Sequence, residues 1–223
     1  MTWLQYAAVI LAFFISHSVP VRPKIRAALV ARLGERGFTT AYSALSLVML
    51  AAVIAAAGHA PFVLLWSQAA WQHHVVMDGM LGVCVLLAFS VGRPNPFSFG
   101  GARNDQFDPA RPGIVGWTRH PVLMALLAWS MLHLLPNGNL AHVILFGIFA
   151  GFAAMGTKLV DKRKRRVMGD DQWQALLAQV RASPLVPAPA RGTKVLIRAG
   201  VALIIYTVLV VLHPMVIGVP VWG

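Results

Sequence analysis

The chain has 223 residues, of which 58% are hydrophobic and 12% are charged, and its formal net charge at pH 7 is +12. This number of charged residues is too small to cover the surface of a soluble globular protein. The composition therefore indicates an integral membrane protein. The basic excess does not indicate nucleic-acid binding, because the 19 Lys and Arg residues fall in three segments that alternate with hydrophobic stretches. A single cysteine, Cys84, excludes a disulfide within the chain and any metal site built from cysteines.

Six hydrophobic segments are candidates to cross a bilayer, which takes roughly 20 apolar residues. In chain order they are Trp3–Val19, Thr40–Gly58, Val75–Gly92, Thr118–Leu135, Leu140–Val160 and Val195–Ile217. The basic segments follow the first, third and fifth of them, and loops rich in Lys and Arg stay in the cytoplasm. The sequence therefore predicts an all-α integral membrane protein with about six transmembrane helices in one bundle and both termini periplasmic. The predicted location is the inner (cytoplasmic) membrane of a bacterium, with the lipid bilayer as partner.

The segments that carry the basic residues differ in character. The stretch Lys24–Arg36 predicts a short amphipathic helix on the inner membrane surface, where anionic lipids attract basic side chains. Segment Arg93–Trp117 is rich in Gly, Pro, Asn and Asp, which favours turns, and it is long for a connection without structure. The third segment begins with the basic run Asp161–Arg166, continues as an interfacial helix around Trp173–Val180, and ends in the proline-rich run Pro184–Pro189.

Histidines are the main chemical resource, since the chain has eight of them and only seven acidic residues. His17 lies within the first predicted span, His120 starts the fourth, and His133 lies further along the fourth. Neutral imidazole is a common metal ligand and an axial ligand of haem iron, and an apolar helical bundle can enclose such a cofactor. The Glu-x-x-His and His-x-x-Glu-His spacings are absent, which argues against di-iron and hydrolytic zinc chemistry. Haem is therefore the favoured metal-containing cofactor.

Several short stretches resemble the NnrU family of bacterial membrane proteins, whose best-known members are linked to denitrification. They are His17-Ser18, Arg32-Leu33-Gly34-Glu35 before Tyr42-Ser43, Arg119-His120-Pro121, and Leu132-His133 followed by Asn137-Gly138-Asn139-Leu140 and Leu145-Phe146-Gly147. The resemblance covers roughly residues 1–165. It implies an NnrU-like transmembrane domain over residues 1–165, a cytoplasmic interfacial segment over 166–194, and an additional C-terminal transmembrane helix over 195–217.

The same family includes the 15-cis-zeta-carotene isomerase of plants and cyanobacteria, an integral membrane enzyme that carries haem b. The resemblance implies that His17 and His133 ligate a haem b iron, since they match the isomerase ligands by motif. His120 matches a further histidine of the family. Ser130 stands where the isomerase has a cysteine that is proposed as an alternative ligand, so the resemblance does not carry over a ligand switch. It does imply a redox or isomerase role, a link to nitrite and nitric oxide metabolism, and a lipophilic small molecule, such as a carotenoid, as ligand.

Straight helices would place the three histidines at different depths in the membrane. At 1.5 Å per residue, His133 lies about 20 Å beyond His120, and His17 lies about 21 Å from the start of its span. Two axial ligands of one iron share a depth, so straight spans favour His17 with His120. The pair implied by the family needs a tilt, a break near Pro20, or a fourth helix that starts deeper. His120 is therefore the alternative second ligand, with Arg119 available to pair a haem propionate or another anion.

Two other functions are open. The Arg119-His120-Pro121 stretch at a helix start, with the later basic segment and Trp173, also resembles isoprenylcysteine methyltransferases and sterol reductases. There this region binds S-adenosylmethionine or NADPH, and a guanidinium suits a carboxylate or phosphate. Those families usually show a Tyr and a Gly soon after the proline, whereas this chain reads Val122-Leu123-Met124-Ala125. The third reading is a non-catalytic factor that aids assembly or expression of a respiratory complex. The sequence does not name its protein partners.

Overall fold

A computed structural model describes residues 1–184 and 192–221, and within these ranges it has seven α-helices, two short 3-10 helices and no β-strand. Its contacts divide the chain into two compact units. The first unit consists of Met1–Trp66 and Gly138–Leu145, and the second consists of Ser67–Asn137 and Phe146–Gly223. The all-helical class that the sequence predicts is confirmed. Apart from Pro184, the predicted proline-rich run lies outside the described residues.

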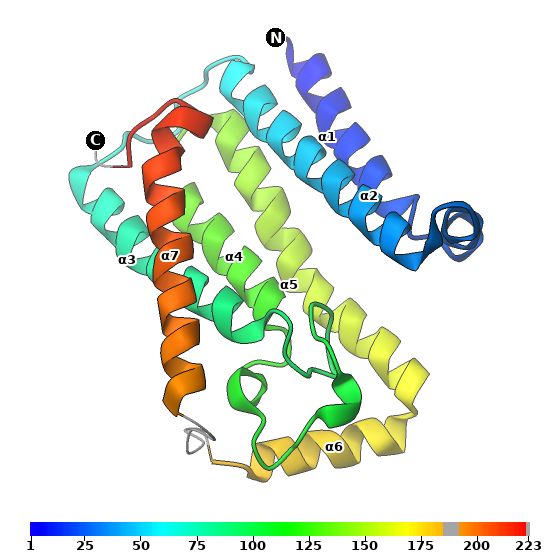
Figure 1. The fold of residues 1–223 in the computed structure, drawn as a ribbon. Coiled ribbons are helices and arrows are strands. Elements are labelled where there is room, and N and C mark those ends of the chain that lie inside the picture. The colour runs from blue at the N-terminus through cyan, green and yellow to red at the C-terminus, as the bar shows by residue number, and fades with distance from the viewer. Residues whose placement is uncertain (185–191, 222–223) are drawn as a thin grey trace. The chain divides into compact units, whose positions relative to one another are not determined.

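The first unit is built on a pair of helices. Helix α1 (Trp3–Ser18) packs along α2 (Pro23–His59), as Figure 1 shows. The Tyr6 hydroxyl donates a buried hydrogen bond of 2.7 Å to the carbonyl of Ala141, in the first turn of α5 (Leu140–Met168). A phenol buried among apolar side chains needs such an acceptor, so this bond fixes α1 against the start of α5.

Helix α2 turns a corner at Gly34, where φ is +71° and ψ is 166°. Only glycine adopts this backbone conformation at little cost. Arg26 braces the corner, because its guanidinium lies 2.6 Å from a carboxylate oxygen of Glu35 and 5.3 Å from the centre of the Phe38 ring. The stretch Lys24–Arg36 is therefore helical up to the corner, in agreement with the sequence, and its position at the membrane surface stays a prediction.

The ends of the first unit meet in a tight backbone contact. The Leu65 N–H donates to the Gly138 carbonyl at 2.7 Å, and Leu64 pairs with Asn139 in an isolated antiparallel bridge. A Cβ atom on Gly138 would lie 1.9 Å from the carbonyl oxygen of Trp66. Position 138 therefore accepts only glycine while this contact is kept.

The second unit is centred on α3 (Ala70–Ser90), which contacts both α4 (Pro121–Leu134) and α7 (Gly192–Ile217) (Figure 1). The α3–α4 contact is close, because a Cβ atom on Gly79 would lie 2.5 Å from a methyl carbon of Leu132. Small residues allow this approach of two apolar helices, where the tight packing of side chains is the main attraction inside a bilayer.

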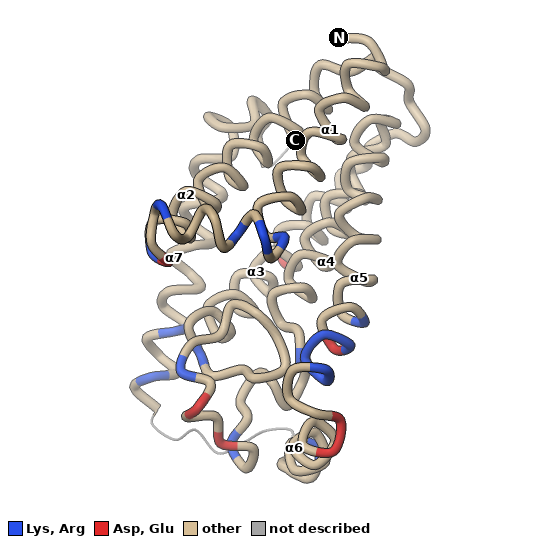
Figure 2. Tube along the Cα trace, turned by 90° about the vertical axis from the view of Figure 1, so that its right-hand side faces the viewer, with Lys and Arg blue, Asp and Glu red and all other residues tan. Residues whose placement is uncertain are grey.

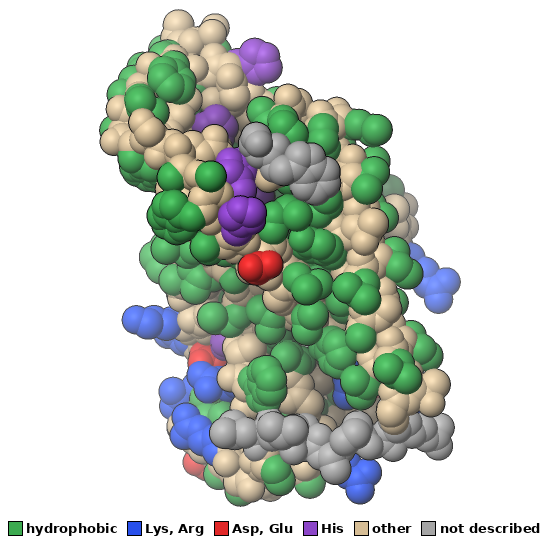
Figure 3. Space-filling model, turned by 90° about the vertical axis from the view of Figure 1, so that its left-hand side faces the viewer, with side chains coloured by type: hydrophobic (Ala, Val, Ile, Leu, Met, Phe, Trp, Pro, Cys, Tyr) green, Lys and Arg blue, Asp and Glu red, His purple; other side chains and the backbone are tan. Residues whose placement is uncertain are grey.

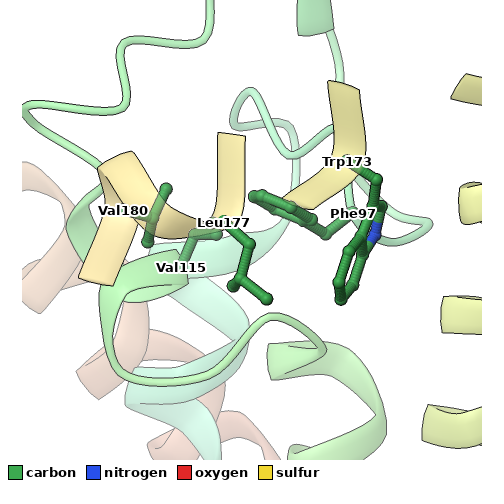
Figure 4. Close-up of a cluster of buried hydrophobic side chains, with 5 residues drawn as sticks. All are labelled: Phe97, Val115, Trp173, Leu177 and Val180. Carbon is green, nitrogen blue, oxygen red and sulfur yellow. The ribbon is translucent and has the colours of Figure 1, made fainter. Parts of the chain in front are cut away.

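The loop between α3 and α4 has a hydrophobic core of its own. It contains the 3-10 helices Asn104–Gln106 and Gly113–Gly116, and it packs on α6 (Asp170–Ala182). The buried cluster between them consists of Phe97, Val115, Trp173, Leu177 and Val180 (Figure 4). The helix predicted around Trp173–Val180 is thus confirmed as α6, and the turn-rich composition of the loop is compatible with a defined structure.

Four helices, α2, α3, α5 and α7, are long and apolar enough to cross a membrane. The other two predicted spans coincide with α1, of 16 residues, and α4, of 14 residues. At 1.5 Å per residue these two helices are about 24 Å and 21 Å long, less than the roughly 30 Å of a hydrocarbon core. The molecule is therefore a multi-pass membrane protein with at least four helices of sufficient length in the described residues.

Basic residues are concentrated in a few segments, and the long helices expose apolar side chains. Lys and Arg lie on both sides of the corner of α2, in the loop after α3, at the end of α5, in α6 and near the start of α7 (Figure 2). Hydrophobic side chains cover much of the face shown in Figure 3. On α7 the exposed side chains include Leu196, Ile204 and Val211. Apolar surface of this extent is stable in contact with lipid rather than water.

Candidate functional site

His17 lies near the end of α1 in the first unit, among aromatic side chains. Its ring stacks on Phe13 with centroids 5.2 Å apart, and the Tyr42 ring lies 5.6 Å away. The Tyr42 hydroxyl donates to the backbone carbonyl of His17 at 2.9 Å, which fixes the backbone at this point. The Nδ1 atom of His17 is buried and has no hydrogen-bond partner among the described residues. A buried polar atom without a partner is costly, so this nitrogen is a candidate ligand atom.

His133 lies in the last turn of α4, in the second unit. Its Nδ1–H donates to the carbonyl of Trp129 at 2.9 Å, and its ring lies 5.0 Å from the Trp129 ring and 5.4 Å from the Phe146 ring. A carbonyl only accepts, so the neutral ring carries its proton on Nδ1 and keeps a lone pair on Nε2. Bonds of this kind hold the orientation and tautomer of metal-ligating histidines.

A cavity of about 120 Å³ lies beside His133 in the second unit. Its lining includes His73, His133, His213 and Tyr206. His73 donates from Nδ1 to the carbonyl of Val221 at 3.0 Å, and His213 donates from Nδ1 to that of Val219 at 2.8 Å. All three rings therefore have Nδ1 bonded to a carbonyl. Within the described part of the chain, no three His, Cys, Asp or Glu side chains are grouped so that they could hold a metal ion.

His120 immediately precedes α4, and both of its ring nitrogens are engaged. Nδ1 lies 3.1 Å from the hydroxyl of Ser98, and Nε2 lies 2.9 Å from a carboxylate oxygen of Asp161. The second oxygen of Asp161 accepts a hydrogen bond of 2.8 Å from Nη2 of Arg119. The Asn95 side chain donates to the Arg119 carbonyl at 3.0 Å, so the loop after α3 is tied into the same network. His120 itself is only 3% exposed.

The structure brings together only some of the residues that the sequence groups as one site. Arg119 and His120 meet at one carboxylate, that of Asp161. His120 and His133 lie at opposite ends of α4. His17 belongs to the first unit, with a different environment. The sequence offers no clear sign of Asp161 as the partner, since this acid opens a run of basic residues. His73 and His213 lie beside the same cavity as His133, and no motif in the sequence links them to it.

The His120 network predicts a dependence of stability on pH. Burial lowers the pKa of His120 from 6.5, while the charge and hydrogen bond of Asp161 raise it in part. The unfolded chain therefore binds more protons than the folded chain below about pH 6.5, and stability falls as pH drops toward the folded pKa. We expect the unfolding temperature to fall more between about pH 7 and pH 5 in the wild type than in His120→Gln. Equal falls in both proteins, measured in detergent, would contradict this assignment.

A second, larger hollow is wholly apolar in character. It has a volume of about 650 Å³ and is lined by residues of α3 and α4 together with Ile114 and Trp117. Among the lining residues are Gly82, Leu86, Met131 and Leu132. Its volume lies within the range of small-molecule sites, and its surface suits a lipid chain or another lipophilic molecule.

Comparison with known proteins gives a family but no individual relative. No curated protein and no solved structure matches the chain. The family model described as "NnrU protein" matches residues 5–221. The match includes both units, the buried network around His120, the cavity beside His133 and the last helix, α7. The chain therefore belongs to the NnrU family.

Proposed function

We propose that this protein is a membrane haem b-binding protein in which His133 would hold the iron. The proposal rests on the tautomer of the His133 ring. Its Nδ1–H donates to the Trp129 carbonyl, so Nε2 keeps its lone pair, and the ring lies beside a cavity. That is the arrangement expected of a histidine ready to ligate iron. The aromatic rings of Trp129 and Phe146 restrict its rotation.

His17 is the second proposed ligand, because of the surroundings of its own ring. Its buried Nδ1 lacks a hydrogen-bond partner among the described residues, so iron could fill that position. His120 fits the role less well, because Ser98 and Asp161 engage both of its nitrogens. Ligation by His120 would require the loss of one of these buried bonds. The resemblance to the isomerase likewise points to His17 and His133.

The space beside His133 sets a condition on the proposal. The cavity of about 120 Å³ is smaller than the 300–1,000 Å³ of typical ligand sites, so a macrocycle could enter only if neighbouring side chains move. The segment held by His73 and His213 through the carbonyls of Val221 and Val219 is the part whose release would enlarge it. When bound, haem would supply one-electron redox chemistry or a polarising metal centre for isomerisation. The link to denitrification and the use of a lipophilic substrate follow from the family resemblance alone.

Topology is part of the same proposal. We place the protein in the inner membrane of a bacterium with six spans, α1 and α4 being the short ones, and with both termini outside. The support is the distribution of Lys and Arg, which keeps basic segments in the cytoplasm. The methyltransferase reading has less support, because Asp161 already engages two nitrogens of Arg119, the group that would bind the carboxylate or phosphate of that cofactor.

The test is the visible spectrum of detergent-purified protein, oxidised and dithionite-reduced, after expression with added haem precursor. We expect a sharp α-band in the reduced wild type and its loss in both His133→Ala and His17→Ala. His120→Gln is the matched control and should keep the band. A featureless wild-type spectrum would overturn the haem proposal and favour the non-catalytic role, and an unchanged band in His133→Ala would remove His133 as ligand.

A further inference from the structure

Trp173 presents a buried hydrogen-bond donor that nothing in the described residues satisfies. Its side chain is 4% exposed and forms part of the cluster with Phe97 and Leu177. The indole Nε1 is buried and has no hydrogen-bond partner among residues 1–184 and 192–221. Figure 4 shows this nitrogen on the side of the ring turned away from Leu177. Buried indole N–H groups normally find an acceptor, so the missing partner is an oxygen that comes from outside the described chain.

Two guanidinium groups lie over the same ring. Arg119 is 5.7 Å and Arg165 is 5.2 Å from the centre of the Trp173 ring. Asp161 engages Nε and Nη2 of Arg119, and Asp170 engages Nε of Arg165, so each guanidinium keeps N–H groups for another acceptor. The groups around the ring are therefore hydrogen-bond donors, which is the composition expected of an anion site.

Charge around Trp173 favours the same class of ligand. The end of α5 carries six basic residues, namely Lys158, Lys162, Arg163, Lys164, Arg165 and Arg166. The acids nearby are Asp161, Asp170 and Asp171. Figure 2 shows this concentration of basic positions where α5 meets α6. The excess of positive charge disfavours a cation and attracts phosphate oxygens.

We propose that Trp173, Arg165 and Arg119 bind a phosphate group, with the indole N–H donating to one oxygen and the guanidinium groups donating to the others. The side chain of Arg165 is 44% exposed, lies over the ring and is paired with Asp170, so we infer that an oxygen reaches Nε1 when Arg165 leaves that ion pair and turns to the phosphate. Asp161 stays bonded to His120 throughout, since that bond does not involve the free N–H groups. The phosphate comes from an anionic lipid headgroup or from solution, and the chemistry of recognition is the same.

The experiment observes the Trp173 indole N–H directly. The full chain, labelled with 15N-tryptophan, is placed in phosphatidylcholine nanodiscs, and its seven indole signals are assigned with single Trp→Phe variants, by elimination where one does not fold. Phosphatidylglycerol is then raised in the discs, or inorganic phosphate is titrated into discs of phosphatidylcholine alone. We expect a saturable downfield shift of the Trp173 signal in at least one series. A response to phosphatidylglycerol alone assigns the lipid headgroup, and a response to inorganic phosphate assigns a soluble source.

Variants separate a specific site from general attraction. Arg165→Gln leaves the buried cluster intact and should raise the half-saturating amount of phosphate or phosphatidylglycerol several-fold. Arg166→Gln removes the same charge one residue further along α5 and should leave that amount nearly unchanged. A Trp173 signal that responds in neither series overturns the proposal, and so does an equal effect of the two variants. Haem binding is read in a separate spectrum, so failure of this site leaves the haem proposal standing.

Discussion

Gly138→Ala is expected to destabilise the protein by more than about 3 kcal/mol, beyond the usual range for overpacking, because the added methyl group meets rigid backbone. Its Cβ would lie 1.9 Å from the carbonyl oxygen of Trp66, and relief would break the bond from Leu65 to the Gly138 carbonyl. The pairing of Leu64 with Asn139 would be lost with it. Thermal unfolding of the detergent-purified protein, together with the yield of folded protein, measures the effect.

Gly147→Ala is the matched control for that substitution. It adds the same methyl group to α5, and nothing in the described residues lies within 4 Å of the new Cβ atom at Gly147 or at Gly151. Alanine is favoured over glycine inside a helix by about 0.5–1 kcal/mol, so Gly147→Ala should be neutral or stabilising. Equal destabilisation by the two variants would show that the contact at Trp66 is not what makes position 138 sensitive.

Asp161→Asn is expected to lower the free energy of unfolding by about 1.5–3 kcal/mol, the range typical of hydrogen bonds to charged groups. Asp161 is 20% exposed at its side chain and holds both Arg119 and His120. Asparagine keeps the size of the side chain and removes the charge, which leaves the guanidinium of Arg119 half-buried without a counterion. Chemical or thermal unfolding in detergent gives the difference from the wild type.

Asp105→Asn removes an equal charge from an exposed position in the loop after α3, and it should change stability little. A double-mutant cycle of Asp161→Asn with His120→Gln then measures the coupling between the two side chains. Because Asp161 and His120 are 2.9 Å apart, the two effects should be less than additive. Strict additivity would show that the hydrogen bond between them contributes little to stability.

Hydropathy and the positions of Lys and Arg were sufficient to predict the helices of this protein. The segment predicted as Val195–Ile217 is α7, Gly192–Ile217, and the helix predicted around Trp173 is α6. The predicted fourth span begins three residues early, because proline can occupy the first turn of a helix and Pro121 does so here. The corner at Gly34 depends on a single positive φ angle, which hydropathy cannot register.

The network around His120 was harder to predict from the sequence, because its members are distant in the chain. Arg119 and His120 are neighbours, but Asp161 stands 41 residues beyond His120 and was interpreted as part of a basic run. The approach of His73 and His213 to the cavity of His133 depends on the packing of α3 and α7, which helix propensities do not predict. Which nitrogens are engaged, and which are free, emerges only from hydrogen bonds to backbone carbonyls.

The cluster between the loop and α6 has a consequence for biosynthesis. Phe97 leaves the ribosome 76 residues before Trp173, which at typical rates of synthesis is a delay of about 4–15 s. During that interval Phe97 and Val115 have no α6 to cover them, so lipid or a chaperone must shield these side chains on the nascent chain. A chain that stops before Asp170 would keep them exposed and would be a target for quality-control proteases, even though α1 to α5 are complete.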